Sequence, residues 1–458
     1  MLKILKLLMN SPSVPSSRRR FLKSAVSTGA GLLILPGGHR LGAQAPSNKL
    51  NVLLIGVWGR GQAHYDSLSE QNVVALCDVN EKRFPDALKK FPNAKTYVDW
   101  RQAVDHKGID AVVCCSADHT HAFVANWCLN RNLHVYCEKP LAISVEEART
   151  VRANWLTKKG KLATQVGMQR HAMQNFNRVR ELVRDGAIGA ISDAFAWGNR
   201  QIRRDKYPAG DGAPPEGFHF DLWLGPSPAH PYNPAYFKGV AGMNCLEWNM
   251  FRDFGAGQIG DMGSHTMDLL WNAVDAKLPT SVVAKGDPFN AEVTPVELEA
   301  HFEHPANDWR GPINVGWYQG GAMPRSPKPE IDLNKISHGV MFKGKSGYVI
   351  ADFDSRLIVP FGDNADLSYY KPRNKETLLP DIGHFQKQWL DACKDPGKPT
   401  ACDFEYSGNM IEQMLLGLVA HQVGKKFQYD SATGQATDCP EANQFMGRKY
   451  REGWTLNG

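Results

Sequence analysis

The segment Asn51-Val52-Leu53-Leu54-Ile55-Gly56-Val57-Trp58-Gly59-Arg60-Gly61 decides the fold. Its apolar start is typical of a buried strand, and its glycines lie where a strand would turn into a helix. A Gly-x-Gly-x-x-Gly turn at that place lets a pyrophosphate approach backbone N–H groups. Gly56 and Gly61 fit the first and third glycine positions, but Trp58 occupies the second, so Gly59 is the candidate for the open backbone. The segment predicts the start of a dinucleotide-binding Rossmann domain.

Short apolar runs alternate with helical patterns through the next hundred residues. The candidate strands, rich in Val, Ile, Leu and Cys, are Asn51–Gly56, Val73–Asp78, Lys95–Val98, Ala111–Ser116, His134–Glu138 and Leu162–Gly167. Strands that alternate with helices in this way indicate a doubly wound parallel sheet. We therefore predict an α/β Rossmann domain over residues 46–168.

The pattern changes after Gln169. A helix is predicted over Asn177–Asp185, and residues 198–255 are rich in Pro, Gly and aromatic residues, as in a long ordered loop region. Alternating segments between Ser281 and Val359 indicate antiparallel strands. We therefore predict an α+β domain over residues 169–458, with an open and mainly antiparallel sheet.

Asp78 closes the second strand, about twenty residues after the glycine turn. A carboxylate at this position accepts hydrogen bonds from an adenosine ribose and repels a 2′-phosphate. Asp78 therefore favours NAD over NADP as the cofactor, and the alternative is an ordinary aspartate at a strand end.

Three separated motifs identify a family resemblance. Ser116-Ala117-Asp118-His119-Thr120-His121 ends the fourth strand, Glu138-Lys139-Pro140 ends the fifth, and Gly260-Asp261-Met262-Gly263-Ser264-His265 opens a helix. Together with the glycine turn they resemble the Gfo/Idh/MocA oxidoreductases, named for glucose–fructose oxidoreductase and inositol dehydrogenase. The segment Phe220–Pro226 also resembles a loop of exported members.

The resemblance implies roles for individual residues. Lys139 and His265 would flank the reacting carbinol, and Asp261 would position the substrate or His265. We expect His265 to be the general base, with a pKa near neutrality, and Lys139 to polarise the oxygen or relay the proton. The residues implied in cofactor binding are Gly56, Gly59, Arg60, Gly61, Asp78, Asp118, His121, Glu138, Lys139 and Gln169. No metal site is expected.

Aromatic residues of the second domain leave two interpretations open. Trp197, Tyr232, Tyr236 and Trp248 would either form a wall on which a sugar ring stacks or fill the core.

The net positive charge of the chain comes from its first 45 residues. Seven of its 53 Lys/Arg residues and none of its 47 Asp/Glu residues lie in residues 1–45, so the remainder has a net charge of −1. This distribution argues against nucleic-acid binding. Ser17-Arg18-Arg19-Arg20-Phe21-Leu22-Lys23 resembles a twin-arginine export signal, and the apolar stretch after it is shorter than the ~20 residues of a transmembrane helix. We predict a signal region over residues 1–45, the twin-arginine translocase as partner, and a periplasmic or otherwise extracytoplasmic location.

The predicted activity is NAD(P)-dependent oxidation or reduction of a hydroxyl of a sugar, glycoside or polyol. Because free dinucleotide is scarce outside the cytoplasm, we expect a tightly retained cofactor. The alternatives are a glycosidase that works by transient oxidation, elimination, water addition and re-reduction, and a non-catalytic protein that binds a sugar or the cofactor. The family resemblance also implies a homo-oligomer.

Overall fold

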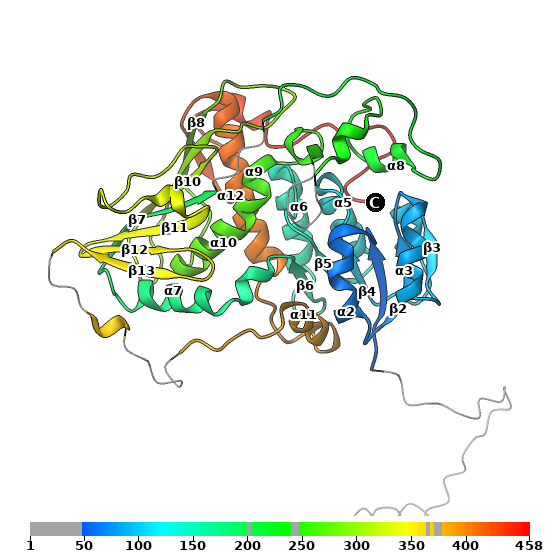
Figure 1. Cartoon of the computed structure of the whole chain (residues 1–458), viewed down its shortest axis with the longest axis horizontal. Helices are drawn as coiled ribbons and strands as arrows, with labels where there is room; N and C mark the ends of the chain where they lie inside the picture. Colours follow the sequence, from blue (N-terminus) through cyan, green and yellow to red (C-terminus); the bar gives the residue numbers. More distant parts are fainter. Residues whose placement is uncertain (1–47, 199–202, 240–246, 363–366, 371–377) are drawn as a thin grey trace, which may run out of the picture. The chain divides into compact units, whose positions relative to one another are not determined.

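The computed structural model describes residues 48–198, 203–239, 247–362, 367–370 and 378–458 (Figure 1). Residues 48–458 form one compact unit that contains two β-sheets. The predicted export signal lies outside the described residues. Within the described ranges, no helix is both long enough and apolar enough to cross a bilayer.

The first sheet has six parallel strands in the order β3-β2-β1-β4-β5-β6. Its strands are β1 (Asn51–Ile55), β2 (Asn72–Cys77), β3 (Lys95–Tyr97), β4 (Ala111–Cys114), β5 (His134–Cys137) and β6 (Thr164–Val166). The helices between them are η1 (Gly59–His64), α2 (Tyr65–Leu68), η2 (Glu81–Arg83), α3 (Phe84–Lys90), α4 (Trp100–Ala103), α5 (Asp118–Asn130) and α6 (Val145–Leu156). β4 is completely buried, as a strand covered by helices on both faces should be. The predicted doubly wound parallel sheet is confirmed.

The second sheet has nine strands in the order β13-β12-β11-β7-β10-β9-β8-β14-β15. They are β7 (Ile191–Gly198), β8 (Ser281–Gly286), β9 (Leu298–His304), β10 (Ile313–Gln319), β11 (His338–Gly344), β12 (Gly347–Ala351), β13 (Arg356–Pro360), β14 (Phe427–Asp430) and β15 (Gln435–Ala436). Neighbouring strands are antiparallel except β7 and β10, which run parallel. The sheet is thus mainly antiparallel, as predicted.

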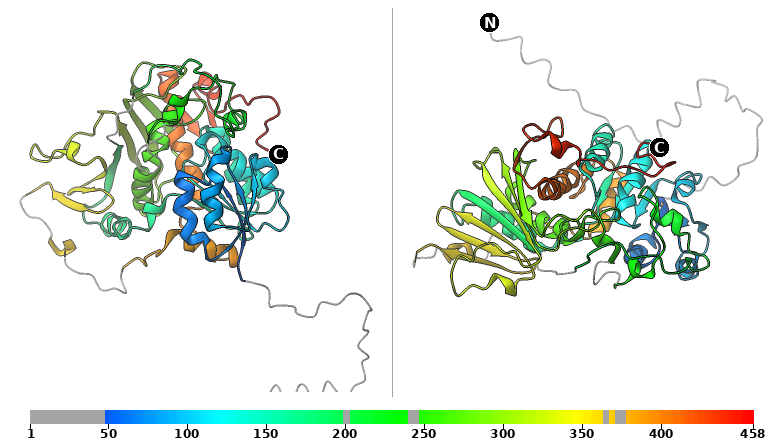
Figure 2. Two further views of the ribbon diagram at one scale, coloured as in Figure 1. Left: turned by 45° about the vertical axis from the view of Figure 1, so that its right-hand side comes forward. Right: turned by 90° about the horizontal axis from the view of Figure 1, so that it is seen from above.

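A layer of helices lies between the two sheets (Figures 1 and 2). It contains α10 (Met262–Val274), which packs on β7, and α12 (Phe404–Val423), which packs on β8 and on α6 of the first sheet. Glu412 of α12 is completely buried and pairs with Arg149 and Arg152 of α6. The other helices of this part are η3 (Gln169–Ala172), α7 (Gln174–Arg184), α8 (Phe220–Leu224), η4 (Pro234–Phe237), η5 (Glu247–Met250), α9 (Gly257–Gly260), η6 (Leu333–Lys335), η7 (Leu367–Tyr370), α11 (Phe385–Lys394) and α13 (Pro440–Asn443).

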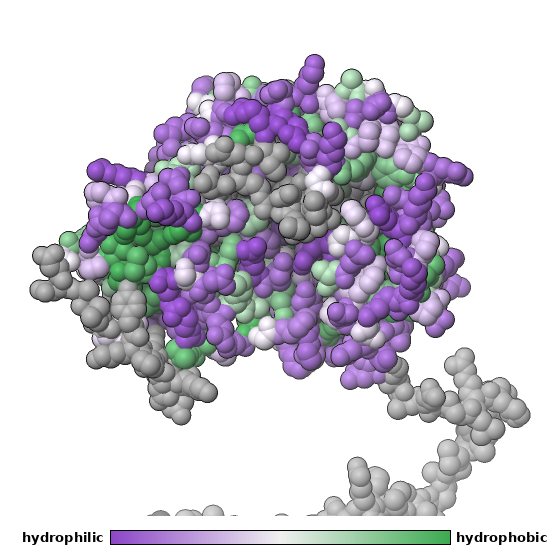
Figure 3. Space-filling view, in the orientation of Figure 1, coloured by the Kyte–Doolittle hydropathy of each residue, from purple (hydrophilic) through white to green (hydrophobic). Residues whose placement is uncertain are grey.

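The opposite face of the second sheet carries a separate apolar cluster, which we call the outer cluster. Its buried members are Trp197, Tyr318, Leu333, Met341, Ile350 and Val359. Leu357, two residues before Val359 and so on the same face of β13, is 47% exposed. A hydrophobic area is visible on the surface over this part of the second sheet (Figure 3).

Candidate functional site

A cavity of about 710 Å³ lies beyond the carboxyl ends of β1, β2, β4 and β5. The strand order places β1 beside both β2 and β4, and open α/β sheets bind ligands at such a switch point. The predicted residues that line the cavity are Gly56, Gly59, Arg60, Asp78, Asp118, His121, Glu138, Lys139, Gln169, Asp261 and His265. Of the predicted site residues, only Gly61 is outside this lining.

The glycine turn has the backbone that a phosphate cradle needs. Gly56 has φ +78° and Gly59 φ +61°, a region that side chains disfavour. Gly61 packs behind the turn, where a Cβ atom would lie 1.9 Å from the carbonyl oxygen of Gly56. Trp58 has an ordinary extended backbone and is 42% exposed. Gly59 therefore supplies the open backbone, and the second glycine position tolerates a side chain.

Trp58 contacts a cation at the rim of the cavity. The guanidinium carbon of Arg83 lies 4.0 Å from the Trp58 ring centroid, a cation–π distance. Both side chains line the cavity.

Asp78 holds the glycine turn against the end of β2. One of its carboxylate oxygens accepts from the backbone N–H of Val57 (3.0 Å) and the other from that of Asn80 (2.9 Å). Burial raises its pKa above the ordinary value. Asp78 therefore shapes the turn and also lines the cavity where an adenosine ribose is predicted.

Glu138 is the centre of a buried ion-pair network. One of its oxygens lies 2.8 Å from Nε of Arg60 and 2.8 Å from Nε2 of His64. Burial on its own raises the pKa of Glu138, but Arg60 and His64 outweigh it and lower the pKa to about 2. The network fixes Arg60 beside the glycine turn. Nη2 of Arg60 is buried without a hydrogen-bond partner in the described structure.

Lys139, Asp261 and His265 meet in the wall of the same cavity, next to the Glu138 network. Lys139 forms an ion pair with Asp261, the residue that precedes α10, and His265 follows one turn later. The expected pKa of His265 near neutrality is wrong, because burial and then the charge of Lys139 lower it to about 3. The imidazole is therefore neutral at physiological pH, and its Nδ1 finds no hydrogen-bond partner among the described residues.

Asp118 and His121 extend this charged cluster from the first turn of α5. Burial raises the pKa of Asp118 to about 6, and its carboxylate accepts from Nδ2 of Asn249 (2.5 Å). His121 directs Nδ1 to the carbonyl of Pro140 (2.7 Å) and Nε2 to that of Ser116 (2.9 Å). Because both partners are acceptors, the contacts favour the doubly protonated ring. Burial lowers the pKa of His121, but Cys114, Asp118 and the two carbonyls outweigh burial and raise it above the ordinary value.

Potential metal ligands gather in the same region. One group joins Cys114, His121 and Cys137, and another joins His64, Cys115 and Glu138. His121 has no lone pair free because both ring nitrogens face carbonyls. Nε2 of His64 faces Glu138. Both histidines thus already have partners among the described residues.

The aromatic residues of the second domain divide between the two interpretations. Tyr232 and Trp248 line the cavity. Trp197 and Tyr236 are completely buried in apolar clusters, so they belong to the core.

Residues 215–223, which we call the strap, close one side of the cavity. The carbonyl of Gly217 accepts from the N–H of Glu81 (2.8 Å), and the N–H of His219 donates to the carbonyl of Val79 (2.8 Å). Nε2 of His219 lies 2.6 Å from Glu81 Oε1, and Phe218 and Trp223 line the cavity. The strap thus attaches the second domain to the loop that follows Asp78.

Sequence reasoning missed several lining residues. Arg170 directly follows Gln169 in η3, just beyond the carboxyl end of β6, so its position was a usable signal. Its charge contributes to the lowered pKa of His265. Asn249 and the strap come from the aromatic loop region, where no local pattern indicates which residues turn towards the cavity.

The residues present fit a dinucleotide. The glycine turn leaves room for a pyrophosphate beside the η1 N–H groups, and the buried Nη2 of Arg60 and Oε1 of Gln169 have no partners in the described structure. The size of the cavity lies in the range of ligand sites, roughly 300–1,000 Å³.

Comparison with known proteins gives a match over the first domain. Residues 50–168 match the Gfo/Idh/MocA family, described as an oxidoreductase family with an NAD-binding Rossmann fold. Inositol 2-dehydrogenase of Salmonella typhimurium is 31% identical over 142 residues, which are 30% of this chain and 42% of that protein. Myo-inositol 2-dehydrogenase of Thermotoga maritima is 29% identical over 143 residues, 31% of this chain and 42% of that protein. The match thus spans less than half the length of these curated relatives.

Solved structures share the fold over both sheets. A WlbA dehydrogenase from Bordetella pertussis, in complex with NADH and UDP-GlcNAcA, has a TM-score of 0.55 and 15% identity, and the match covers 83% of this chain and 98% of that one. A levoglucosan dehydrogenase, in complex with NADH and levoglucosan, has a TM-score of 0.53 and 16% identity, with 83% and 99% covered. At these identities the likeness shows the fold alone.

Proposed function

We propose that this chain, whose residues 50–168 match the Gfo/Idh/MocA family of oxidoreductases with an NAD-binding Rossmann fold, is an oxidoreductase acting on a hydroxyl of a sugar, glycoside or polyol. The observation that carries the proposal is the meeting of Lys139, Asp261 and His265 in the wall of the same cavity as the glycine turn. The inositol dehydrogenases among the relatives support the substrate class.

The charged cluster supports a division of roles. A bound nicotinamide would supply a hydride acceptor. The neutral imidazole of His265 accepts the proton of the substrate hydroxyl, and the ammonium of Lys139 stabilises the negative charge that develops on that oxygen. Asp261 is a positioning residue, because its ion pair holds Lys139 beside the start of α10. Burial of His265 keeps water from competing for the proton.

We propose NAD as the cofactor. The carboxylate of Asp78 lines the cavity and would repel a 2′-phosphate. Lys82 and Arg83 also line this region, so their charges oppose the effect of Asp78. Binding of the two dinucleotides to the purified protein would decide between them.

We propose further that the cofactor is retained during turnover. The strap bonds to the loop after β2 through two backbone hydrogen bonds and the contact of His219 with Glu81, and these contacts would hinder release of a dinucleotide on that side. A retained cofactor must be regenerated in place. This requirement favours either a second substrate or a redox-neutral glycosidase cycle.

The location and assembly of the protein are also proposals. The twin-arginine motif in residues 1–45 supports folding before export to the periplasm through the twin-arginine translocase. The apolar outer cluster, with Leu357 47% exposed beside it, supports a homo-oligomer that pairs through this face.

Mass spectrometry of the denatured, purified protein tests cofactor retention directly. We expect one NAD per chain, and a His219→Ala variant that loses the dinucleotide faster on dialysis. Wild-type protein without dinucleotide, or with NADP, would contradict the proposal.

Turnover is tested with myo-inositol, D-glucose and p-nitrophenyl glycosides. Reduction of the bound cofactor without glycoside cleavage indicates a dehydrogenase, and cleavage without net reduction indicates the glycosidase cycle. Lys139→Ala, saturated with NAD, should lose at least ~100-fold in turnover. The exposed Lys89→Ala is the matched control. Intact turnover in Lys139→Ala, or no reaction with any of these compounds, would count against the assignment.

A further inference from the structure

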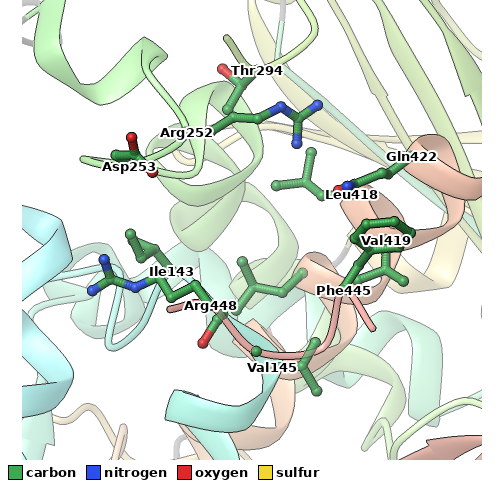
Figure 4. A pocket seen from close by; sticks show the side chains of 14 residues that line it. Ile143, Val145, Arg252, Asp253, Thr294, Leu418, Val419, Gln422, Phe445 and Arg448 are labelled. Carbon is green, nitrogen blue, oxygen red and sulfur yellow. The ribbon is translucent and has the colours of Figure 1, made fainter. Parts of the chain in front are cut away.

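A second cavity, of about 160 Å³, shares no lining residue with the first (Figure 4). It lies where the start of α6, the loop before α9, helix α12 and the C-terminal segment meet. One wall is polar and carries Arg252, Thr294 and Gln422. Since a water molecule occupies ~30 Å³ in the liquid, the space holds several waters or one small molecule.

Arg252 places an uncompensated positive charge in this wall. Its Nε donates to the carbonyls of Asn290 (2.7 Å) and Val293 (2.9 Å), but Nη2 is buried without a partner in the described structure. None of the carboxylates in the described ranges forms an ion pair with it. Burial accordingly lowers its pKa to about 10. The ring of Phe289, 4.9 Å from the guanidinium carbon, gives only weak compensation.

The other charged residues of the cavity already have partners. Arg448 pairs with Glu147 (2.7 Å). Asp253 accepts from the hydroxyl of Tyr207 (2.8 Å) and faces Nε2 of His230 (2.7 Å). In Figure 4 the guanidinium of Arg252 extends towards Leu418 and Gln422, on the side away from Asp253. The guanidinium of Arg252 therefore reaches a part of the wall, beside Leu418 and Gln422, where no carboxylate of the described residues pairs with it.

Part of the remaining lining is apolar and includes Leu418, Val419 and Phe445. We propose that this cavity binds a small organic carboxylate. Its head group would accept paired N–H bonds from the Arg252 guanidinium, and its short aliphatic body would pack on Leu418, Val419 and Phe445. Inorganic phosphate fits less well because it has no aliphatic body to pack on these three side chains.

Sodium butyrate is a suitable probe, used with the full chain in chloride buffer. Isothermal titration should show saturable binding of one butyrate per chain, and 1-butanol and phosphate should bind at least roughly tenfold more weakly. Added NADH should leave butyrate binding unchanged, since the first cavity is separate. Absence of saturable binding, displacement by NADH, or equal binding of 1-butanol or phosphate would overturn the proposal.

Substitutions locate the site. Arg252→Met should abolish butyrate binding, whereas Arg325→Met, at an exposed arginine, should bind as wild type does. If Arg252→Met does not fold, Arg252→Lys keeps the charge and should bind roughly tenfold more weakly, because an ammonium cannot make the paired bonds. Unchanged binding in the Arg252 variant that folds would refute the assignment.

Discussion

The Glu138 network makes a quantitative prediction about stability. Glu138 is 4% exposed, and Arg60 and His64 outweigh the effect of burial to lower its pKa from the ordinary 4.5 to about 2. One pKa unit corresponds to ~1.4 kcal/mol. Ionised Glu138 therefore stabilises the folded state by about 3 kcal/mol at neutral pH. Glu138→Gln should lower the free energy of unfolding by up to that amount.

The pH dependence of this effect has a definite sign. Above pH 4.5 the carboxylate is ionised in both the folded and the unfolded chain, so the full stabilisation is present. Below pH 4.5 Glu138 becomes protonated in the unfolded chain, whereas in the folded chain it stays ionised down to about pH 2. The difference between wild type and Glu138→Gln should therefore begin to shrink as the pH falls below 4.5.

Urea denaturation of both proteins at pH 7 and at pH 4 measures these differences. Glu441→Gln is the matched control, because Glu441 pairs with Lys425 on the surface, where such pairs contribute little. Since Glu138 also fixes Arg60, the affinity for NAD should fall in Glu138→Gln but not in Glu441→Gln. An equal loss of stability in both variants, or none in Glu138→Gln, would refute the reasoning.

Three further predictions concern pH and assembly. If Asp118 is the group of the cluster that titrates near pH 6, kcat/KM should rise through an apparent pKa near 6, and Asp118→Asn should remove that step from the pH profile. Burial lowers the pKa of His119 and His304 to about 3, so the unfolded chain binds protons first as the pH falls below 6.5. The free energy of unfolding, followed by denaturant titration, should decline from pH 6.5 downward, and less steeply in His304→Gln. Leu357→Asp should dissociate the homo-oligomer in light scattering, whereas Lys89→Asp, at an exposed lysine of the first domain, should leave its mass unchanged.

The first sheet could be predicted from sequence because its strands are short, apolar and separated by helical patterns. All six predicted strands overlap the observed ones, within about two residues at each end. The cofactor turn and the ends of β2, β4 and β5 follow from the same rule, since ligands lie at the carboxyl ends of parallel strands.

Contacts between residues far apart in the chain determine the features of the site that could not be predicted from the sequence. The lowered pKa of His265 depends on burial and on Lys139, which lies more than a hundred residues away in the chain. The pairing of Asp261 with Lys139 has the same origin. Tyr232 lines the cavity, whereas Tyr236, four residues later, is buried in the core. The surrounding loops, and not a regular helix or strand periodicity, determine where these two side chains point.

The strap also bears on the order in which the protein is assembled. Every residue of the Rossmann domain precedes Pro215, so a ribosome completes the glycine turn, Asp78 and Lys139 before it begins the strap. During this interval the wall that the strap gives to the cavity is missing. It forms once residues 215–223 bond to Val79 and Glu81. If NAD is retained as proposed, loading before this step would make the NAD supply during synthesis set the fraction of active molecules.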